Sequence, residues 1–433
     1  MSRRQQTGTA STKHPRLLSI NNYNYRRGGA EVVYAEHNRL LTDAGWDVGC
    51  FAMQHPKNDP DPNDDLFVEE IEFGNDYGPS RKILNASRVI YSFEARRKIA
   101  AMVDRTRPDI AHAHNIYHHI SPAIFPELRK AGVPTVMTLH DLKLACPAYT
   151  MRVNNAVCER CKDGRIYNVV LNRCIKGSVP LSTMIMFETA LHRGLRIYDN
   201  HIDRFVVPSH FLINKLVEWG WKRERFLYVP NIVDCTKHHY DDQPGKSFTF
   251  FGRLSHEKGL TTLIEAAAIA RQPITLVGTG QQEAELRKRA SDRNADVTFL
   301  GYQTGKDLHA AIHNSRAIVL PSTWYENAPI SILEAYALGR PVIGADIGGI
   351  PEMIRHGETG EVFQSGNAAG LADCLARFAA MPDAKVAEMG RSGRAWVEQD
   401  FSPKTYIEAI TDLYAQLGAP TNNDEPTTRN YAS

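Results

Sequence analysis

One stretch in the second half of the chain constrains the fold more than any other. It runs from Pro321 to Glu352 and reads PSTWYENAPISILEAYALGRPVIGADIGGIPE. Its apolar segment, Pro329 to Leu338, predicts a helix, because Pro stands at the first position and Gly339 follows the last. β-branched runs on either side, Ala317 to Leu320 and Pro341 to Asp346, predict buried strands. In a parallel sheet this unit points the free N–H groups of the helix N-terminus at the carboxyl edge, which favours a phosphate ligand.

Two carboxylates frame the predicted helix, Glu326 in the preceding loop and Glu334 on the second turn. At about 1.5 Å of rise per residue, eight positions would separate them by roughly 12 Å if both were helical. That spacing is too long for two carboxyl groups that share a proton. It suits two contacts with one elongated ligand.

The length of the chain indicates two domains. With 433 residues and 42% apolar content, it exceeds what one hydrophobic core usually spans, and two domains of roughly 200 residues are expected. No segment approaches the roughly 20 apolar residues of a membrane span. The basic N-terminus is followed by no signal-type apolar region. We therefore expect a cytoplasmic protein.

Alternating strand and helix patterns occur in both halves. The first half opens with a strand at Arg16 to Ile20, a helix at Ala30 to Ala44 and a strand at Trp46 to Met53, and the second half repeats the alternation from Ser247. This alternation predicts two doubly wound parallel sheets. The predicted parts are a disordered tail (1–14), a first domain (15–230), a hinge (231–246), a second domain (247–400), a last helix (401–417) and a second tail (418–433).

Two loops offer groups that suit a phosphate. In the first domain, Gly28 and Gly29 begin a helix directly after two arginines, and glycines allow a close backbone approach. A tight turn is the alternative interpretation. In the second domain, Arg253 and Lys258 lie in a loop that follows a strand, where a guanidinium and an ammonium suit a diphosphate. A surface loop with two cations is the alternative there.

Two patterns could bind a metal ion. His112 and His114 share one face at the end of a strand, but no third ligand of suitable spacing is adjacent. Asp59-Pro60-Asp61 matches the Asp-x-Asp pattern of metal-dependent transferases, yet it lies in a loop rich in Pro and Asp, which favours a solvated turn.

An insert from 146 to 180 holds four of the seven cysteines, Cys146, Cys158, Cys161 and Cys174. A Cys-x2-Cys pair with two flanking cysteines fits a structural zinc site of four thiolates. Reduced structural or redox-active thiols are the second interpretation. Disulfides are the third, and a reducing cytoplasm disfavours them.

Positive charge gathers in the first half of the chain. Residues 1–207 carry 28 Lys and Arg against 22 Asp and Glu, and the remainder carries 23 against 27. Residues 81–103 form a long helical pattern in which cations alternate with apolar residues. This helix predicts either contact with an anionic membrane or an ordinary surface helix.

Taken together, the Glu-x7-Glu pair, the preceding Pro-Ser and the following Gly-Gly-Ile-Pro-Glu resemble the retaining glycosyltransferases of the GT-B fold, family four. The resemblance covers most of the chain. It implies two Rossmann-like domains that face each other across a cleft, and a last helix that crosses back to the first domain. The implied reaction moves a hexose from a nucleoside diphosphate sugar to an acceptor hydroxyl with retention of configuration.

The resemblance also implies roles for single residues. Gly28 and Gly29 would hold the donor diphosphate together with Arg253 and Lys258. Glu326 would hold the sugar hydroxyls and Glu334 the ribose hydroxyls. Backbone N–H groups after Glu326 would assist, and they belong to the segment with Asn327, Ala328 and Ile330. His114 is the nearest candidate for a catalytic contact, and no catalytic metal is expected.

Two other classes compete with this interpretation. A nucleotide-sugar-binding or regulatory protein on the same fold would have lost turnover, but here the predicted donor contacts are all present. A nucleic-acid-binding protein would need a more extended basic face than the short insert provides. The expected acceptor is a glycan or a lipid-linked oligosaccharide of a surface or exopolysaccharide, at the inner face of the membrane.

Overall fold

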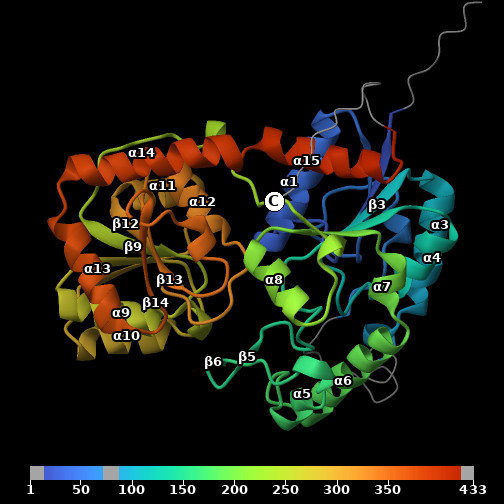
Figure 1. Cartoon of the computed structure of the whole chain (residues 1–433), viewed down its shortest axis with the longest axis horizontal. Coiled ribbons are helices and arrows are strands. Elements are labelled where there is room, and N and C mark those ends of the chain that lie inside the picture. Colours follow the sequence, from blue (N-terminus) through green and yellow to red (C-terminus); the bar gives the residue numbers. More distant parts are fainter. Residues whose placement is uncertain (1–13, 72–86, 421–433) are drawn as a thin grey trace, which may run out of the picture.

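The computed structural model describes residues 14–71 and 87–420, which form two α/β domains side by side (Figure 1). The first domain is built on a six-stranded sheet in the order β2-β1-β3-β4-β7-β8, and the second on one in the order β11-β10-β9-β12-β13-β14. The recorded pairs within both sheets are parallel. The predicted fold class is confirmed.

The first domain encloses its sheet between helices on both faces. Its strands are β1 (Arg16–Ile20), β2 (Asp47–Phe51), β3 (Ile110–Ala113), β4 (Thr135–Thr138), β7 (Arg204–Val207) and β8 (Phe226–Tyr228). Its helices are α1 (Gly29–Asp43), α3 (Phe93–Thr106), α4 (Phe125–Lys130), α5 (Asn168–Leu171), α6 (Val179–Gly194), α7 (Ile197–His201) and α8 (His210–Glu218). The insert adds a short hairpin of β5 (Arg152–Val153) and β6 (Ala156–Val157).

The second domain repeats the plan. Its strands are β9 (Ser247–Phe251), β10 (Ile274–Val277), β11 (Val297–Gly301), β12 (Ser315–Leu320), β13 (Val342–Asp346) and β14 (Gly360–Gln364). Its helices are α9 (Leu260–Ala270), α10 (Glu283–Asp292), α11 (Gly305–His313), α12 (Ile330–Ala337), α13 (Ala368–Ala380) and α14 (Asp383–Asp400).

The strand orders locate the ligand crevices. The winding of the first sheet reverses between β1 and β3, and that of the second sheet between β9 and β12. Ligands of doubly wound sheets bind beyond the carboxyl ends of the strands at such reversals. The segments after these four strands carry the Gly pair, His114, the two cations and Glu326.

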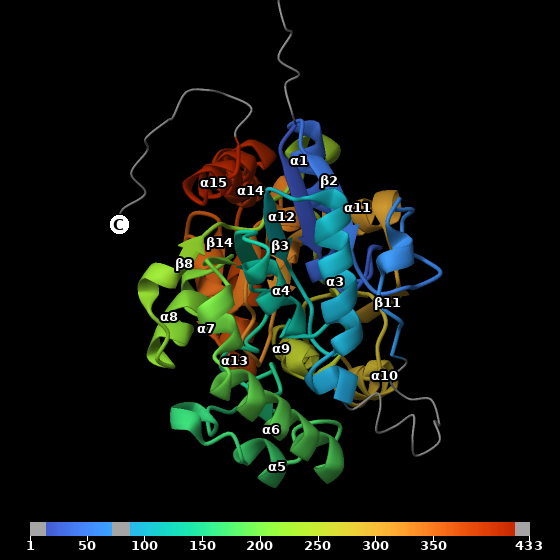
Figure 2. The same cartoon turned by 90° about the vertical axis from the view of Figure 1, so that its right-hand side faces the viewer.

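The last helix, α15 (Pro403–Gln416), belongs to the core of the first domain. Tyr406, Ile410, Leu413 and Tyr414 pack in one buried cluster with apolar residues that include Leu17, Leu40, Leu41, Trp46 and Ile110. α14 lies over the second domain and α15 over the first, along one side of the molecule (Figure 1). Figure 2 shows the pair of helices end on.

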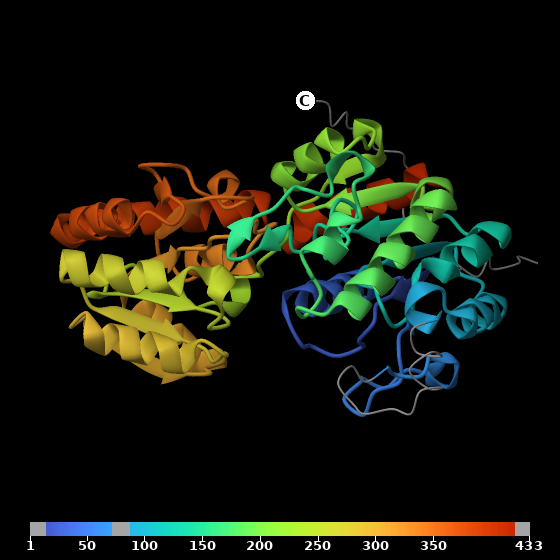
Figure 3. The same cartoon turned by 90° about the horizontal axis from the view of Figure 1, so that it is seen from below.

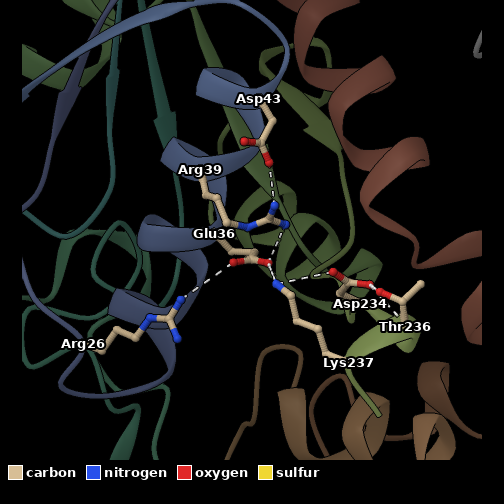
Figure 4. Close-up of polar contacts among 7 residues, drawn as sticks. All are labelled: Arg26, Glu36, Arg39, Asp43, Asp234, Thr236 and Lys237. Carbon is tan, nitrogen blue, oxygen red and sulfur yellow. Dashed lines mark hydrogen bonds and ion pairs between the residues drawn. The ribbon is translucent and has the colours of Figure 1, made fainter. Parts of the chain in front are cut away.

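Ion pairs fasten the segment between the domains to α1 (Figure 4). The Lys237 ammonium lies 2.9 Å from the Glu36 carboxylate and 3.3 Å from that of Asp234. Arg39 reaches Glu36 at 2.7 Å. Because the Lys237 side chain is 52% exposed, its pairs contribute little stability.

One predicted helix differs from the structure, and other expectations fall outside it. Helix α3 begins at Phe93, where Ser92 accepts a hydrogen bond from the Ala95 N–H as an N-cap, so the pattern at 81–103 is not one helix. Residues 81–86 lie outside the described part, as do most of the predicted tails at 1–14 and 418–433. No helix among the described residues combines the length and the apolar character needed to cross a membrane.

Candidate active site

The strand, helix and strand unit of the second domain presents an open helix N-terminus. Every residue of β12 is buried, and the chain turns at 321–329 before α12 begins at Ile330. Pro329 occupies the N-cap and no side chain caps the helix. Gly339, with φ of 79°, follows the last turn in the left-handed conformation that favours glycine. The unit therefore leaves first-turn N–H groups available to a ligand.

A cleft of about 630 Å³ lies between the domains, within the range of small-ligand sites. Both domains line it. The first contributes Gly28, Gly29, His140, Asp141 and Tyr149, and the second contributes Arg253, Lys258, Ser322, Trp324, Glu326, Asn327, Ala328, Ile330 and Glu334. The structure thus brings together all the predicted donor-contacting residues of both domains.

Lys258 and Glu326 form an ion pair in the cleft wall. The Lys258 ammonium lies 2.7 Å from Glu326 Oε1, and the Ser322 hydroxyl donates to the same oxygen at 2.7 Å. Burial acts to raise the pKa of Glu326, but the Lys258 ammonium outweighs it and holds the pKa below its ordinary value. Glu326 is therefore an ionised acceptor, and Lys258 an oriented cation.

Glycines make this pairing geometrically possible. A Cβ on Gly259 (φ 67°) would lie 1.8 Å from the Pro321 carbonyl oxygen, so only glycine lets the Lys258 loop approach β12 this closely. A Cβ on Gly349 would lie 1.8 Å from the Asn327 carbonyl oxygen. Gly349 N–H donates to the Glu326 carbonyl at 2.8 Å. The two Gly-containing loops fix the backbone on both sides of Glu326.

Glu334 differs from Glu326 in having no charged partner. It is half-buried on the second turn of α12, and no ion pair to it is recorded among the described residues. Burial raises the pKa of Glu334 to about 7. An unpaired carboxyl group at the cleft is suited to hydroxyl donors of a ligand.

The N-termini of α1 and α12 face each other across the cleft. A Cβ built on Gly29 would lie 3.8 Å from Ile330 Cδ1. Gly28, with extended backbone, is the N-cap of α1, and a Cβ built there would lie 3.3 Å from Glu31 Oε2. Arg253 extends from the opposite loop with a side chain that is 68% exposed and only a 3.7 Å contact to Glu257. Two helix N-termini and an exposed guanidinium provide a site for a diphosphate.

The structure places His114 behind the cleft wall, whereas the resemblance implied that it is the nearest candidate for a catalytic contact. His114 is buried and its Nδ1 lies 3.1 Å from His140 Nε2, and it is His140 and Asp141 that line the cleft. Burial lowers the pKa of His140 to about 4. Burial raises the pKa of Asp141 to about 6, although the Lys143 backbone N–H at 2.8 Å opposes this.

A third histidine joins the predicted pair, which corrects the expectation that no third ligand is near. His37, on the buried face of α1, brings a ring nitrogen within 4.8 Å of those of His112 and His114. Tyr414 OH lies 2.6 Å from His112 Nδ1 and 3.2 Å from His37 Nε2, and Tyr406 OH lies 2.9 Å from His37 Nδ1. His112 Nε2 and His114 Nδ1 also have partners. Five of the six ring nitrogens thus serve a hydrogen-bonded network.

The four cysteines of the insert converge without reaching zinc-ligand spacing. Cys146, Cys158, Cys161 and Cys174 line one small cavity and are free thiols. Among the described residues, the histidine trio is the one group at the spacing of metal ligands. Burial, with the neighbouring thiols, raises the pKa of Cys161 to about 12 and that of Cys174 to about 11.

Comparison with known proteins decides the family. The family model described as Glycosyltransferase Family 4 matches residues 27–237, and the model described as Glycosyl transferases group 1 matches residues 238–396. The chain belongs to the family 4 glycosyltransferases. The predicted family is confirmed, because the two matches are consecutive and together include both walls of the cleft.

Relatives of this family 4 chain differ in how much of it they cover. D-inositol 3-phosphate glycosyltransferase of Pseudarthrobacter chlorophenolicus is 27% identical over 412 residues, 90% of this chain and 91% of that protein. The amylovoran biosynthesis glycosyltransferase AmsK of Erwinia amylovora is 29% identical over 177 residues, 38% of this chain and 43% of that protein.

Solved structures share the fold of this family 4 chain. Sucrose-phosphate synthase of Thermosynechococcus elongatus superposes with a TM-score of 0.70 at 21% identity, over 93% of this chain and 99% of that one. HepE of Anabaena, solved in complex with UDP and glucose, superposes with a TM-score of 0.63 at 17% identity, over 93% and 100%.

Proposed function

We propose that the protein transfers a hexose from a nucleoside diphosphate sugar to a hydroxyl group of a glycan or lipid-linked acceptor, with retention of configuration. The observation that carries the proposal is the Lys258–Glu326 pair at 2.7 Å beside the open N-terminus of α12. The pair places an oriented cation and an ionised acceptor in one cleft. A UDP complex of the structurally similar HepE supports a nucleotide donor.

In this mechanism the donor spans the cleft along the second domain. Glu334 accepts from the ribose hydroxyls, Arg253 and Lys258 contact the diphosphate, and Glu326 accepts from the hexose hydroxyls. Gly28 and Gly29 bring the α1 N-terminus to the diphosphate from the other side. Negative charge grows on the leaving phosphate in the transition state, so preorganised cations and N–H groups lower the barrier.

The same residues assign no covalent nucleophile. Glu326 is held by Lys258 and Ser322, and Glu334 lies one turn inside α12. Displacement on one face of the sugar fits this arrangement, with the leaving phosphate helping to take the acceptor proton. The retained donor contacts favour turnover over the alternative of a regulatory protein without activity.

We place this reaction in the synthesis of a surface or exopolysaccharide on the cytoplasmic side of the membrane. The similarity to the amylovoran biosynthesis enzyme supports this assignment. A mass-spectrometric screen of nucleotide sugars for hydrolysis by the purified protein tests the donor. Hydrolysis of none of them would contradict the proposed transfer.

We also propose one structural zinc ion in the insert, held by the four cysteines that line one cavity, which would move closer together to reach ligand spacing when the ion binds. A cation would favour the thiolate forms, which the raised pKa values oppose in its absence. We expect about one zinc ion per chain by elemental analysis of protein purified without added metal. Four free thiols and no zinc would instead favour reduced structural thiols.

A further inference from the structure

Large apolar side chains form an exposed stripe on α6 and α5. Phe187 (59% exposed) and Leu191 (39%) lie four residues apart on the outer face of α6, and Leu195 (51%) is the C-cap residue of that helix. Leu171 (71%) and Tyr167 (53%) extend the stripe at α5. We call these five residues the insert face.

The segment that carries the insert face is rich in positive charge, and two exposed acids, Asp163 and Asp199, lie just outside it. Residues 164–198 contain five cations, and the only acid is Glu188. Glu188 is buried and forms an ion pair at 2.7 Å with Lys143, so it contributes no negative charge to the surface. Within the described residues, no ion pair is recorded for the exposed cations Arg173, Lys176 and Arg196.

The insert face lies on the side of the molecule opposite α14 and α15. Figures 1 and 2 show α5 and α6 at the bottom and the last two helices at the top. Figure 3, viewed from below, shows green helices of this part of the chain over the first domain, beside the second. The face is therefore free of the second domain's sheet and of α15.

The apolar side chains and the cations of the insert face indicate which kind of partner fits it. Apolar side chains interspersed with cations, with no exposed acid between 164 and 198, suit the interface of an anionic bilayer, where rings and leucines enter the headgroup region and cations meet phosphates. The core of a protein interface is instead depleted of charge. We propose that the insert face docks the enzyme on an anionic lipid bilayer, an inference that rests on the proposed transfer to a lipid-linked acceptor.

Buried contacts connect this face to the cleft. Glu188 on α6 holds Lys143, and the Lys143 ammonium also donates to the Pro147 carbonyl at 3.0 Å. Lys143 follows His140 and Asp141, which line the cleft. Docking through α6 therefore fixes the first-domain edge of the cleft relative to the membrane. We therefore place the docking surface on α5 and α6, whereas the sequence suggested membrane contact by the helical pattern at 81–103.

Vesicle sedimentation at low salt tests the proposal with the full-length protein. The vesicles are phosphatidylcholine alone or phosphatidylcholine with phosphatidylglycerol. One variant combines Phe187→Glu and Leu191→Glu, and its matched control combines Ile269→Glu and Tyr302→Glu, which are 60% and 73% exposed on the second domain. A second variant carries Gln at Arg173, Lys176 and Arg196, and its control carries Gln at Arg271, Lys306 and Lys404.

We expect binding to the anionic vesicles only, with a loss of roughly fivefold per cation removed and on the order of a hundredfold for the triple variant. The Glu pair should abolish binding, and both controls should bind as the wild type does. Equal losses in variants and controls, or wild-type protein that stays in the supernatant, would overturn the proposal. So would a concentration-dependent dimer that the Glu pair dissolves.

Donor hydrolysis without vesicles separates this inference from the proposed function. The docking variants should hydrolyse the nucleotide sugar at the wild-type rate, because their side chains do not line the cleft. Vesicle binding by a protein that hydrolyses no nucleotide sugar would sink the proposed transfer and leave the docking surface standing. Hydrolysis of a nucleotide sugar by a protein that binds no vesicles would support the proposed transfer and overturn the docking surface.

Discussion

The second domain lines the cleft with an ion pair and a further cation, Arg253, whereas the first domain lines it with one cation, Arg27, and with the buried pair His140 and Asp141. Lys258 and Glu326 form an ion pair at 2.7 Å, while burial lowers the pKa of His140 to about 4 and raises that of Asp141 to about 6. This difference teaches that the ion-paired, oriented charge of the cleft lies on one wall. The opposite wall adds Arg27, the N-terminus of α1 and hydrogen-bonding groups.

The largest predicted effect follows from removing the ammonium of the charged wall. Lys258→Met leaves the buried Glu326 carboxylate without its cation, so the unfolding free energy should fall by about 3 kcal/mol. Turnover should fall by roughly 100-fold or more, because an oriented charge at the leaving group is lost. Steady-state kinetics and thermal unfolding measure both, with Lys306→Met on the exposed surface as control. Unchanged kcat would make the two walls equivalent.

Arg253→Ala tests the second cation of the charged wall, which is more exposed than Lys258. Its side chain is 68% exposed, so stability should change by less than about 0.5 kcal/mol. We expect kcat to fall roughly tenfold to 100-fold while recognition of the sugar changes little, since the guanidinium contacts only phosphate. A larger loss of stability than of activity would show that Arg253 is structural.

Glu334 differs from Glu326 on the same wall because no ion pair is recorded for it among the described residues. The pH dependence of donor affinity tests this difference. Only the carboxylate accepts from two ribose hydroxyls, so donor affinity should rise about tenfold between pH 6 and 8 as a group with a pKa of about 7 ionises. Glu334→Gln should bind the donor more weakly and without this pH dependence. Calorimetry at several pH values measures the affinity, and unchanged affinity in the variant would refute the assignment.

Through Glu334, the free energy of unfolding should decrease as pH rises, whereas the donor affinity increases. Because the folded protein binds the Glu334 proton more tightly than the unfolded chain, with an ordinary pKa of 4.5, the free energy of unfolding falls as pH rises from 4.5 to 7. Above pH 7, Glu334→Gln should therefore be more stable than the wild type by about 1 kcal/mol. The ionised Glu334 side chain thus lowers the stability of the fold and raises the affinity for the donor.

The smallest effect on activity is expected from the network behind the first-domain wall. Tyr414→Phe removes the hydroxyl that His112 and His37 share, which should cost about 1 to 3 kcal/mol of stability and change kcat less than about threefold. Burial lowers the pKa of His37 from 6.5 to about 3, so stability falls as pH drops below 6.5 because the unfolded chain takes up protons first. A kcat loss as large as that of Lys258→Met would show that the two walls of the cleft contribute equally to turnover.

Local patterns predicted the fold and the charged wall well. Strand and helix periodicity, with Pro329 and Gly339 as boundaries, located α12, and the sheet edges where functional loops meet follow from strand order. Glu326 and Lys258 lie 68 positions apart in sequence, and the parallel arrangement of β9 and β12 brings them together.

Long-range contacts explain what local patterns missed. His37 meets His112 only because α1 packs on β3, and nothing in the spacing of either segment indicates it. His114 faces His140 and not the cleft, because the strand-end histidine of β4 lies between. The helix expected from Arg81 is interrupted at Ser92, which is the N-cap of α3. The alternation of cations and apolar residues in this segment did not indicate the N-cap.

The position of α15 in the core of the first domain has a consequence for biosynthesis. Residues 15–230 leave the ribosome first, yet Tyr406, Ile410, Leu413 and Tyr414 arrive after the whole second domain has been made. At roughly 5 to 20 residues per second, the nascent first domain waits for tens of seconds or less with Leu40, Trp46 and its histidines uncovered. The part of the enzyme that is synthesised first is therefore completed last.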